Sequence, residues 1–271
     1  MNTRSVLSAA TLAMLCYGAF SVARADVPAR VELNSGVIEC KLRWMPASKK
    51  YVIVRTAPGG QAMEQQVDPS EILRKQVAPP AGWRELEQLV SKNPDAALPK
   101  LLQIVDEYKM LEYDERAAYY AGMIYLKKGK PQDVIKVSEK VTQDNPAAAS
   151  LSAMAPIYWA ALIQTGKTAG GTLEKMITEA ITSAPRPIAA QALVARGDLL
   201  KKAGRTRDAL KDGYLRCALL YTQEADANAE ALYKASLAFD ELRQATYAER
   251  MRQTLLTKHR NSEFARKLRG N

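Results

Sequence analysis

The stretch Ala121–Pro146, AGMIYLKKGKPQDVIKVSEKVTQDNP, decides the fold predicted for most of this chain. Gly129 follows an apolar segment of helical periodicity, and Gly122 and Tyr125 precede it by seven and four residues. Pro146 comes 17 residues after Gly129, where a second helix would end. The stretch therefore predicts a pair of helices joined by a turn at Gly129.

The same glycine spacing recurs downstream. Gly166 follows the segment APIYWAALIQT, 37 residues after Gly129, and Gly204 follows ALVARGDLLKKA after a further 38. In that unit Gly197 precedes the turn glycine by seven residues, as Gly122 does in the quoted stretch. An internal period of this length indicates an array of helix pairs.

A last unit runs from Glu230 to Leu268, and a poorer first pair is predicted over 83–92 and 96–108. Small positions recur in the second helix of each pair, at Ala97, Val134, Gly171, Ala209 and Ala248. This pattern resembles the tetratricopeptide repeat (TPR), in which small residues let two helices approach and a proline ends the second helix. The resemblance implies a mainly α fold, a TPR-like α-solenoid of about five helix pairs whose stacking supplies the core.

The third pair departs from the family pattern. Trp159 stands where Gly or Ala is expected, and Pro156 interrupts a helix that should be continuous. The period also exceeds the roughly 34 residues of the family. We therefore expect an irregular third pair, with Tyr158 and Trp159 packed between helix pairs. A plain helical bundle is the alternative.

Before the helices, from Ala29 to about Val77, the apolar period is two. Alternating segments bounded by Gly, Pro and Asn predict five short strands, with a helical turn at DPSEI before the last. Their order resembles a small SH3-like β-barrel. Trp44 and Tyr51 flank the turn MPASKK and are expected in the barrel core, with an exposed docking tip as the alternative.

The N-terminus has the pattern of a secretory signal. Arg4 precedes a mostly apolar run that is too short to span a membrane, and Ala23-Arg24-Ala25 fits the small-x-small cleavage rule. We expect export after cleavage at Ala25, and no transmembrane segment in the mature chain. A lipoprotein signal ending at Cys16 would need a small residue where Leu15 stands.

The chain is thus expected to divide into four parts, with the boundary between strands and helices at the proline pair of APPAG. The parts are a signal peptide over 1–25, a β-barrel over 26–78, a linker over 79–82 and TPR-like helices over 83–271.

The net charge of +10, spread along the chain, favours anionic partners. The C-terminal stretch LLTKHRNSEFARKL resembles the last repeats of bacterial envelope proteins of this class, which implies a periplasmic or secreted protein. Nucleic acid is not expected as a partner there. Acidic proteins, anionic lipid headgroups and cell-wall glycans remain as possible partners.

No motif predicts catalysis. ALIQTGKT, over 161–168, nearly matches a phosphate-binding P-loop, but a helical segment precedes it where a P-loop needs a strand. His259 is the only histidine, and no Cys–His cluster has metal-ligand spacing. Cys40 and Cys217 fall in different predicted domains and are expected as two separate thiols. We predict a protein that is not an enzyme and uses no metal or cofactor.

The resemblance to the TPR family implies a function in recognition. In that family the first helix of each pair lines a concave groove and carries the ligand contacts. The positions implied here are Arg116, Tyr119, Lys127, Gln191, Asp198, Lys201, Lys202, Glu230, Tyr233 and Asp240. Cations beside tyrosine suit a peptide or an anionic segment. We expect a non-catalytic adaptor or scaffold for envelope proteins or peptides, with a basic module for anionic glycan or lipid as the alternative.

Overall fold

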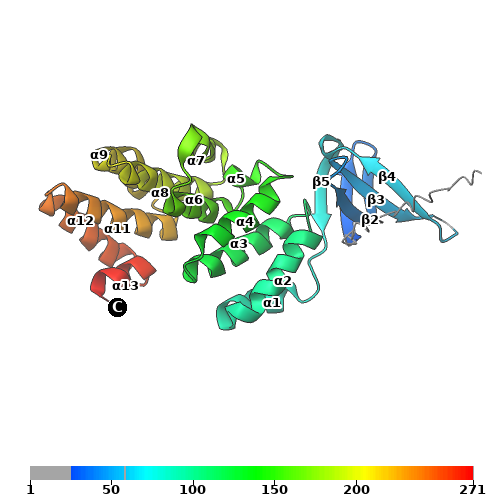
Figure 1. The fold of residues 1–271 in the computed structure, drawn as a ribbon, viewed down its shortest axis with the longest axis horizontal. Helices are drawn as coiled ribbons and strands as arrows, with labels where there is room; N and C mark the ends of the chain where they lie inside the picture. Colours follow the sequence, from blue (N-terminus) through cyan, green and yellow to red (C-terminus); the bar gives the residue numbers. More distant parts are fainter. Residues whose placement is uncertain (1–25, 58, 271) are drawn as a thin grey trace, which may run out of the picture.

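The computed structural model of the protein describes residues 26–57 and 59–270, without the side chain of Ala169. The predicted signal peptide over 1–25, with Cys16, lies outside the described residues. In the described part a five-stranded antiparallel sheet precedes a run of helices, and the fold is mainly helical, as predicted (Figure 1). No described helix is both long enough and apolar enough to cross a membrane.

The strands are β1 (Val27–Leu33), β2 (Gly36–Met45), β3 (Lys50–Thr56), β4 (Ala62–Val67) and β5 (Ile72–Val77). The helices are α1 (Trp83–Lys92), α2 (Pro94–Glu107), α3 (Tyr113–Lys127), α4 (Pro131–Thr142), α5 (Ala148–Leu151), α6 (Ala155–Thr165), α7 (Thr172–Ser183), α8 (Arg186–Lys202), α9 (Thr206–Ala209), α10 (Leu215–Leu220), α11 (Ala225–Glu241), α12 (Ala245–Lys258) and α13 (Glu263–Arg269). Three short helical turns are η1 (Pro69–Glu71), η2 (Ala169–Gly171) and η3 (Leu210–Tyr214), of which η3 is a π-helical turn.

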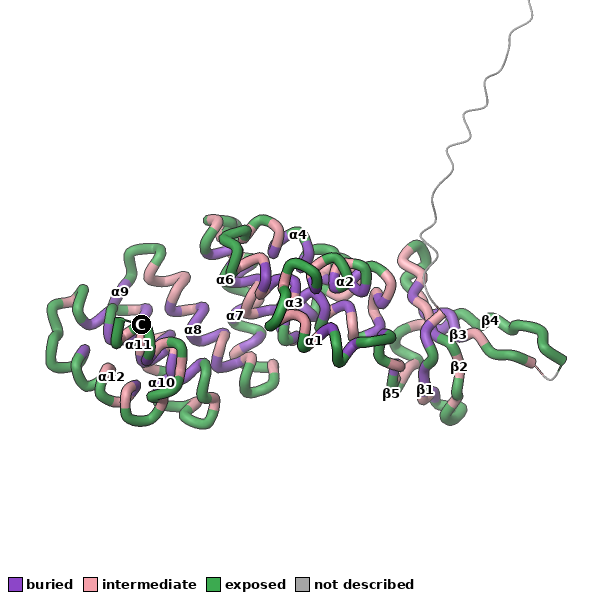
Figure 2. The backbone as a smooth tube through the Cα atoms, turned by 90° about the horizontal axis from the view of Figure 1, so that it is seen from below, coloured by how far each residue is buried: buried purple, intermediate pink, exposed green. Residues whose placement is uncertain are grey.

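The strand order is β4-β3-β2-β1-β5, so the sheet is open. β1 pairs with β2 on one side and with β5 on the other, whereas β4 pairs only with β3. The predicted closure into a barrel is therefore wrong. A closed barrel needs an apolar inner face on every strand, but β4 reads AMEQQV and buries only Val67. Figure 2 shows the exposed course of β4.

The predicted alternation does build the core of the sheet. β1 buries Val27, Ala29, Val31 and Leu33, every second residue along the strand. Across the other hairpin Trp44 lies opposite Tyr51, with their ring centroids 4.9 Å apart at 63°. Both rings are buried, which confirms the core interpretation over the docking tip.

Tyr51 also ties the sheet to the helices. Its hydroxyl donates to the carbonyl of Met110 at 2.9 Å and accepts from Lys75 Nζ at 2.9 Å. The N–H of Met110 donates to Asp114 Oδ2 at 2.8 Å. Met110 and Glu112 have φ of 63° and 71°, a left-handed conformation that non-glycine residues rarely adopt. We call Lys75, Tyr51, Met110 and Asp114 the joint.

Tyr51 and Met110 of the joint belong to a single hydrophobic cluster that extends from the sheet into the first helices. Val31 and Ile53 from the strands belong to the same cluster as Leu101 of α2 and Ala121 of α3. The connection between β5 and α1 is also bonded at both ends, because Ala78 N–H donates to Pro28 O and Trp83 N–H to Pro80 O. The sheet and the helices therefore share one core.

The turn glycines behave as predicted. Gly129, Gly166 and Gly204 follow α3, α6 and α8 with φ of 66°, 76° and 75°, which a residue without Cβ adopts at little cost. In the last pair Arg243 occupies the corresponding turn with φ of 59°. Gly166 thus ends a helix, and the P-loop-like segment over 161–168 begins within that helix, not after a strand.

The helices pack in chain order. α3 packs against α2, α4 and α6; α8 against α6, α7, η3 and α11; and α11 against α8, α10, α12 and α13. Ala97, Val134, Ala209 and Ala248 are fully buried, as small positions at close helix contacts should be. Gly171 is an exception, because it lies before α7 with φ of 69°.

The third pair is irregular, as expected. Its first segment is divided into α5 and α6, and Pro156 lies in the first turn of α6, where its missing N–H costs nothing. Trp159 is fully buried and its Nε1 donates to Ala149 O at 2.8 Å, which fastens α5 to α6. Tyr158 and Trp159 both pack in the core, as predicted.

α8 and the π turn η3 approach each other closely at two glycines. A Cβ added at Gly197 would lie 2.3 Å from Tyr214 Cε1, and one added at Gly213 would lie 2.5 Å from the Cα of Gly197. Gly122 is less crowded, since its nearest neighbour would be the Cγ2 methyl of Ile157 at 3.0 Å. Only a residue without Cβ fits at Gly197.

Gly197→Ala should therefore lower the free energy of unfolding by about 1–3 kcal/mol, because overpacking outweighs the gain in helix propensity. Gly122→Ala is the matched control and should change stability by less than about 1 kcal/mol. Urea denaturation measures both variants. Equal effects would contradict the close approach of α8 and η3.

Asp114 should make stability depend on pH. Burial raises the pKa of its carboxyl from 3.8 to about 7, and the hydrogen bond from Met110 only partly opposes this. Between about pH 4 and 7 the Asp114 carboxyl is protonated in the folded chain and ionised in the unfolded chain. The free energy of unfolding therefore falls as pH rises through this range. Asp114→Asn should remove this fall, which amounts to at most about 4 kcal/mol.

Urea denaturation at several pH values measures that slope, and the asparagine carbonyl can still accept from Met110. Glu85→Gln, which changes an exposed carboxylate of α1, is the control and should leave the slope unchanged. An unaltered slope in Asp114→Asn would show that the carboxyl is ionised in the folded chain.

Candidate functional site

An open cavity of about 520 Å³ lies where α3, α6, α8, α11 and α13 face one another, and we call it the central cavity. Its apolar wall includes Met123, Ile157, Ile163, Ile188 and Phe264. Its polar side chains are Tyr119, Gln191, Asp198, Glu230 and Glu263. A concave, mostly apolar surface with a few polar groups is the usual form of a binding site.

Helical spacing explains why these residues converge. α3 contributes Tyr119, Met123 and Leu126, which lie four and three residues apart and therefore on one face. α8 contributes Gln191, Val194 and Asp198 at the same spacing. Because α6 lies between α3 and α8 in the packing order, the three helices present adjacent faces to one space.

Carboxylates set the charge of the cavity. Asp198 of α8 and Glu230 of α11 both bind Lys234 Nζ, at 2.5 and 2.7 Å, and Tyr214 donates its hydroxyl to Asp198 at 2.8 Å. Burial alone would lower the pKa of Lys234, but Glu230 and Asp198 raise it above its ordinary value, so Lys234 stays charged. Lys234 thus neutralises one of these two carboxylates.

α13 closes one side of the cavity. Ser262 caps this helix by accepting from the N–H of Ala265 at 3.1 Å, and Phe264 packs on Tyr233 with ring centroids 5.6 Å apart. Glu263 forms an ion pair with Lys267, which lowers the pKa of the Glu263 carboxyl; Lys127 of α3 lowers it further. α3 and the last helix, α13, therefore line the same cavity.

Four of the ten predicted contact residues line the central cavity: Tyr119, Gln191, Asp198 and Glu230. Tyr233 touches its lining through Phe264, and Lys127 lies near Glu263 at its edge. Burial raises the pKa of the Tyr119 hydroxyl, and Asp226 adds to this effect. The structure thus brings four of the predicted residues, from three helices, to one cavity.

The other four predicted residues hold helices to one another. Arg116 pairs with Glu87 at 2.9 Å and lies over the rings of Trp83 and Tyr113. Lys201 pairs with Glu241 at 3.1 Å, and Asp240 pairs with Arg252. Lys202 donates to the carbonyl groups of Ile163 and Gln164, at the end of α6. The structure therefore uses three predicted ligand-binding cations, Arg116, Lys201 and Lys202, in internal contacts.

The sequence analysis missed the apolar wall. Met123, Ile188 and Phe264 have the periodicity of core residues, so their sequence pattern does not separate a cavity wall from a buried face. Glu263 was missed because the position of α13 depends on packing between distant segments. One feature of the sequence did point to the cavity: Tyr119, Gln191 and Glu230 each lie on the first helix of a predicted pair.

The residues considered for chemistry lie in both the sheet and the helices. Cys40 of β2 and Cys217 of α10 are both free thiols, and burial raises the pKa of Cys217 to about 12. His259 Nε2 lies 2.9 Å from the side-chain oxygen of Asn228. Among the described residues no three His, Cys, Asp or Glu side chains are grouped to hold a metal ion.

Lys234→Met should lower the free energy of unfolding by about 1–3 kcal/mol, because it keeps the length of the side chain but leaves two partly buried carboxylates without their cation. In a variant that already carries Asp198→Asn and Glu230→Gln, Lys234→Met should lower the free energy of unfolding by clearly less than in the wild-type chain. Thermal denaturation of the four proteins of this cycle measures the coupling. A coupling of zero would show that Lys234 contributes only by packing.

Comparison of the chain with protein-family models, curated proteins and solved structures found no match. The residues of the chain and their geometry are therefore the basis for a functional proposal.

Proposed function

We propose that this chain is a non-catalytic adaptor, exported to the bacterial cell envelope, that holds a segment of a partner protein in the central cavity. The observation that carries the proposal is that Tyr119, Gln191, Asp198 and Glu230, four first-helix positions implied by the TPR resemblance, line one cavity. The turn glycines and the chain-order packing of the helices support a TPR-like arrangement. The signal-like N-terminus supports export.

The cavity favours a particular kind of segment. Its apolar wall suits Leu, Ile or aromatic side chains, which gain about 25 cal/mol for each Å² of apolar surface removed from water. Asp198, Glu230 and Glu263 face it; Lys234 neutralises one of the first two, and Lys267 pairs with Glu263, which leaves one of the three carboxylates without a cation of its own. We therefore expect an apolar segment with a Lys or Arg, and the carboxylates disfavour a polyanionic glycan or lipid headgroup in this place.

A photo-crosslinking amino acid placed at Ala160, an exposed residue of the cavity wall, tests the proposal in the full chain expressed in bacteria. It should crosslink one or a few discrete proteins. The same group at Lys175, on the exposed face of α7, is the matched control and should give none of them.

Gln191→Lys adds a cation to the cavity and should reduce this crosslinking at least about tenfold, whereas Gln191→Glu should preserve it. Crosslinks that are equally strong from Lys175, or unaffected by Gln191→Lys, would refute binding in the central cavity. Adducts only with lipid or glycan would favour a basic binding module instead.

A further inference from the structure

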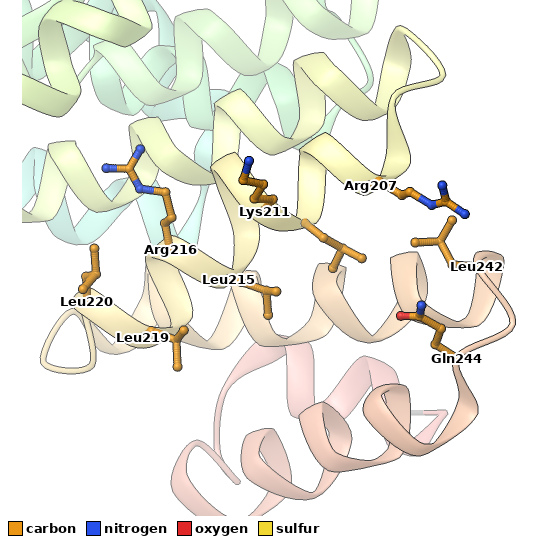
Figure 3. A pocket seen from close by; sticks show the side chains of 9 residues that line it. Arg207, Lys211, Leu215, Arg216, Leu219, Leu220, Leu242 and Gln244 are labelled. Atoms are coloured by element: carbon orange, nitrogen blue, oxygen red, sulfur yellow. The ribbon is translucent and has the colours of Figure 1, made fainter.

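A second groove lies on the helical region, away from the residues of the central cavity. It has a volume of about 520 Å³ and is formed by α9, η3, α10 and the turn between α11 and α12 (Figure 3). We call it the leucine groove, because five of its nine lining residues are leucines: Leu210, Leu215, Leu219, Leu220 and Leu242. The others are Arg207, Lys211, Arg216 and Gln244.

Two of the leucines are unusually exposed. Leu219 is 73% exposed and Leu220 is 59% exposed, and both lie in the last turn of α10. Removing leucine side chains from water is favourable, so neighbouring exposed leucines in a groove favour a site that a partner covers.

The three cations of the groove lie along one edge. In Figure 3 the side chains of Arg207, Lys211 and Arg216 follow one side, while Leu215 and Leu219 lie along the other. None of these cations has an ion-pair partner among the described residues, unlike the neighbouring Arg205, which binds Asp208 at 2.7 Å. Their charge is therefore available to a ligand.

The π turn produces this alignment. Arg207 and Lys211 are four residues apart, but Lys211 and Arg216 are five apart. In a regular α-helix that spacing would turn Arg216 away from the row, since one turn takes 3.6 residues. The hydrogen bonds of a π turn span five residues, and η3, over Leu210–Tyr214, contains Lys211 and ends two residues before Arg216. The extra residue keeps the three cations on one edge.

We propose that the leucine groove binds an acidic amphipathic helix of a partner protein. Such a helix would place Leu or Phe side chains among the leucines and a row of Asp or Glu opposite Arg207, Lys211 and Arg216. Cations spaced by about one helical turn match carboxylates at i, i+4 and i+8 on the ligand. A flat lipid surface would touch Leu219 and Leu220 without filling the groove between α10 and the turn at Gln244.

The test uses the full mature chain and two labelled synthetic helical peptides of about 18 residues. Both carry the same leucine face; one has a row of Glu along its edge, and the other has Lys. The Glu peptide should bind in the micromolar range and weaken as salt is raised, because the contacts at the edge are screened. The Lys peptide should bind at least about tenfold more weakly.

Variants locate the binding. Lys211→Glu with Arg216→Glu should weaken the Glu peptide at least about tenfold and strengthen the Lys peptide, a reversal that misfolding cannot produce. Leu219→Ser should weaken the binding of both peptides. The matched controls are Arg250→Glu, an exposed cation of α12, and Leu237→Ser, a leucine of α11 that is 40% exposed; both should leave binding unchanged.

Three results would overturn the proposal. They are equal affinity for the two peptides, absence of reversal in the double charge variant, and binding to phosphatidylglycerol vesicles that depends on the same residues while neither peptide binds. The inference does not rest on the central cavity, and Gln191→Lys should leave peptide binding unchanged.

Discussion

The hydrogen bonds at Met110 are the constraint on which the arrangement of the whole molecule depends. Met110 holds a left-handed backbone conformation, and both of its peptide groups are engaged: the carbonyl by Tyr51 of the sheet and the N–H by Asp114 of α3. The same bonds therefore fix the turn between α2 and α3 and the position of the sheet on it. Every later helix takes its place by packing on α3 and its successors.

The second constraint is the contact between α8 and the π turn η3. The missing Cβ atoms of Gly197 and Gly213 let the two backbones meet, and Tyr214 packs over the contact while its hydroxyl reaches Asp198. One face of this contact thus positions a carboxylate of the central cavity. The π turn also carries Lys211, and Arg216 follows it in α10, both on the leucine groove. A single local irregularity serves two surfaces of opposite charge.

Features determined by local backbone geometry could be predicted from sequence, whereas those determined by distant contacts could not. Gly129, Gly166 and Gly204 mark turns because left-handed φ favours glycine, and Ala97 and Ala248 mark close helix contacts because larger side chains do not fit. Barrel closure was predicted wrongly, because the alternation does not show that β4 lacks the apolar inner face that a closed barrel needs. The partners of Arg116 and Lys202 were missed because each cation binds a residue of a distant helix.

The connection at Pro79 and Pro80 has a mechanical consequence. The sequence predicts a linker there, and two domains joined by a short linker are usually expected to move relative to each other. Here both ends are hydrogen-bonded, and a continuous hydrophobic cluster runs beneath the connection from the strands into the first helices. A pull on the sheet is therefore transmitted to α1, α2 and α3 rather than absorbed by a hinge. The shared core therefore fixes the direction from which anything attached to the sheet meets the first helices.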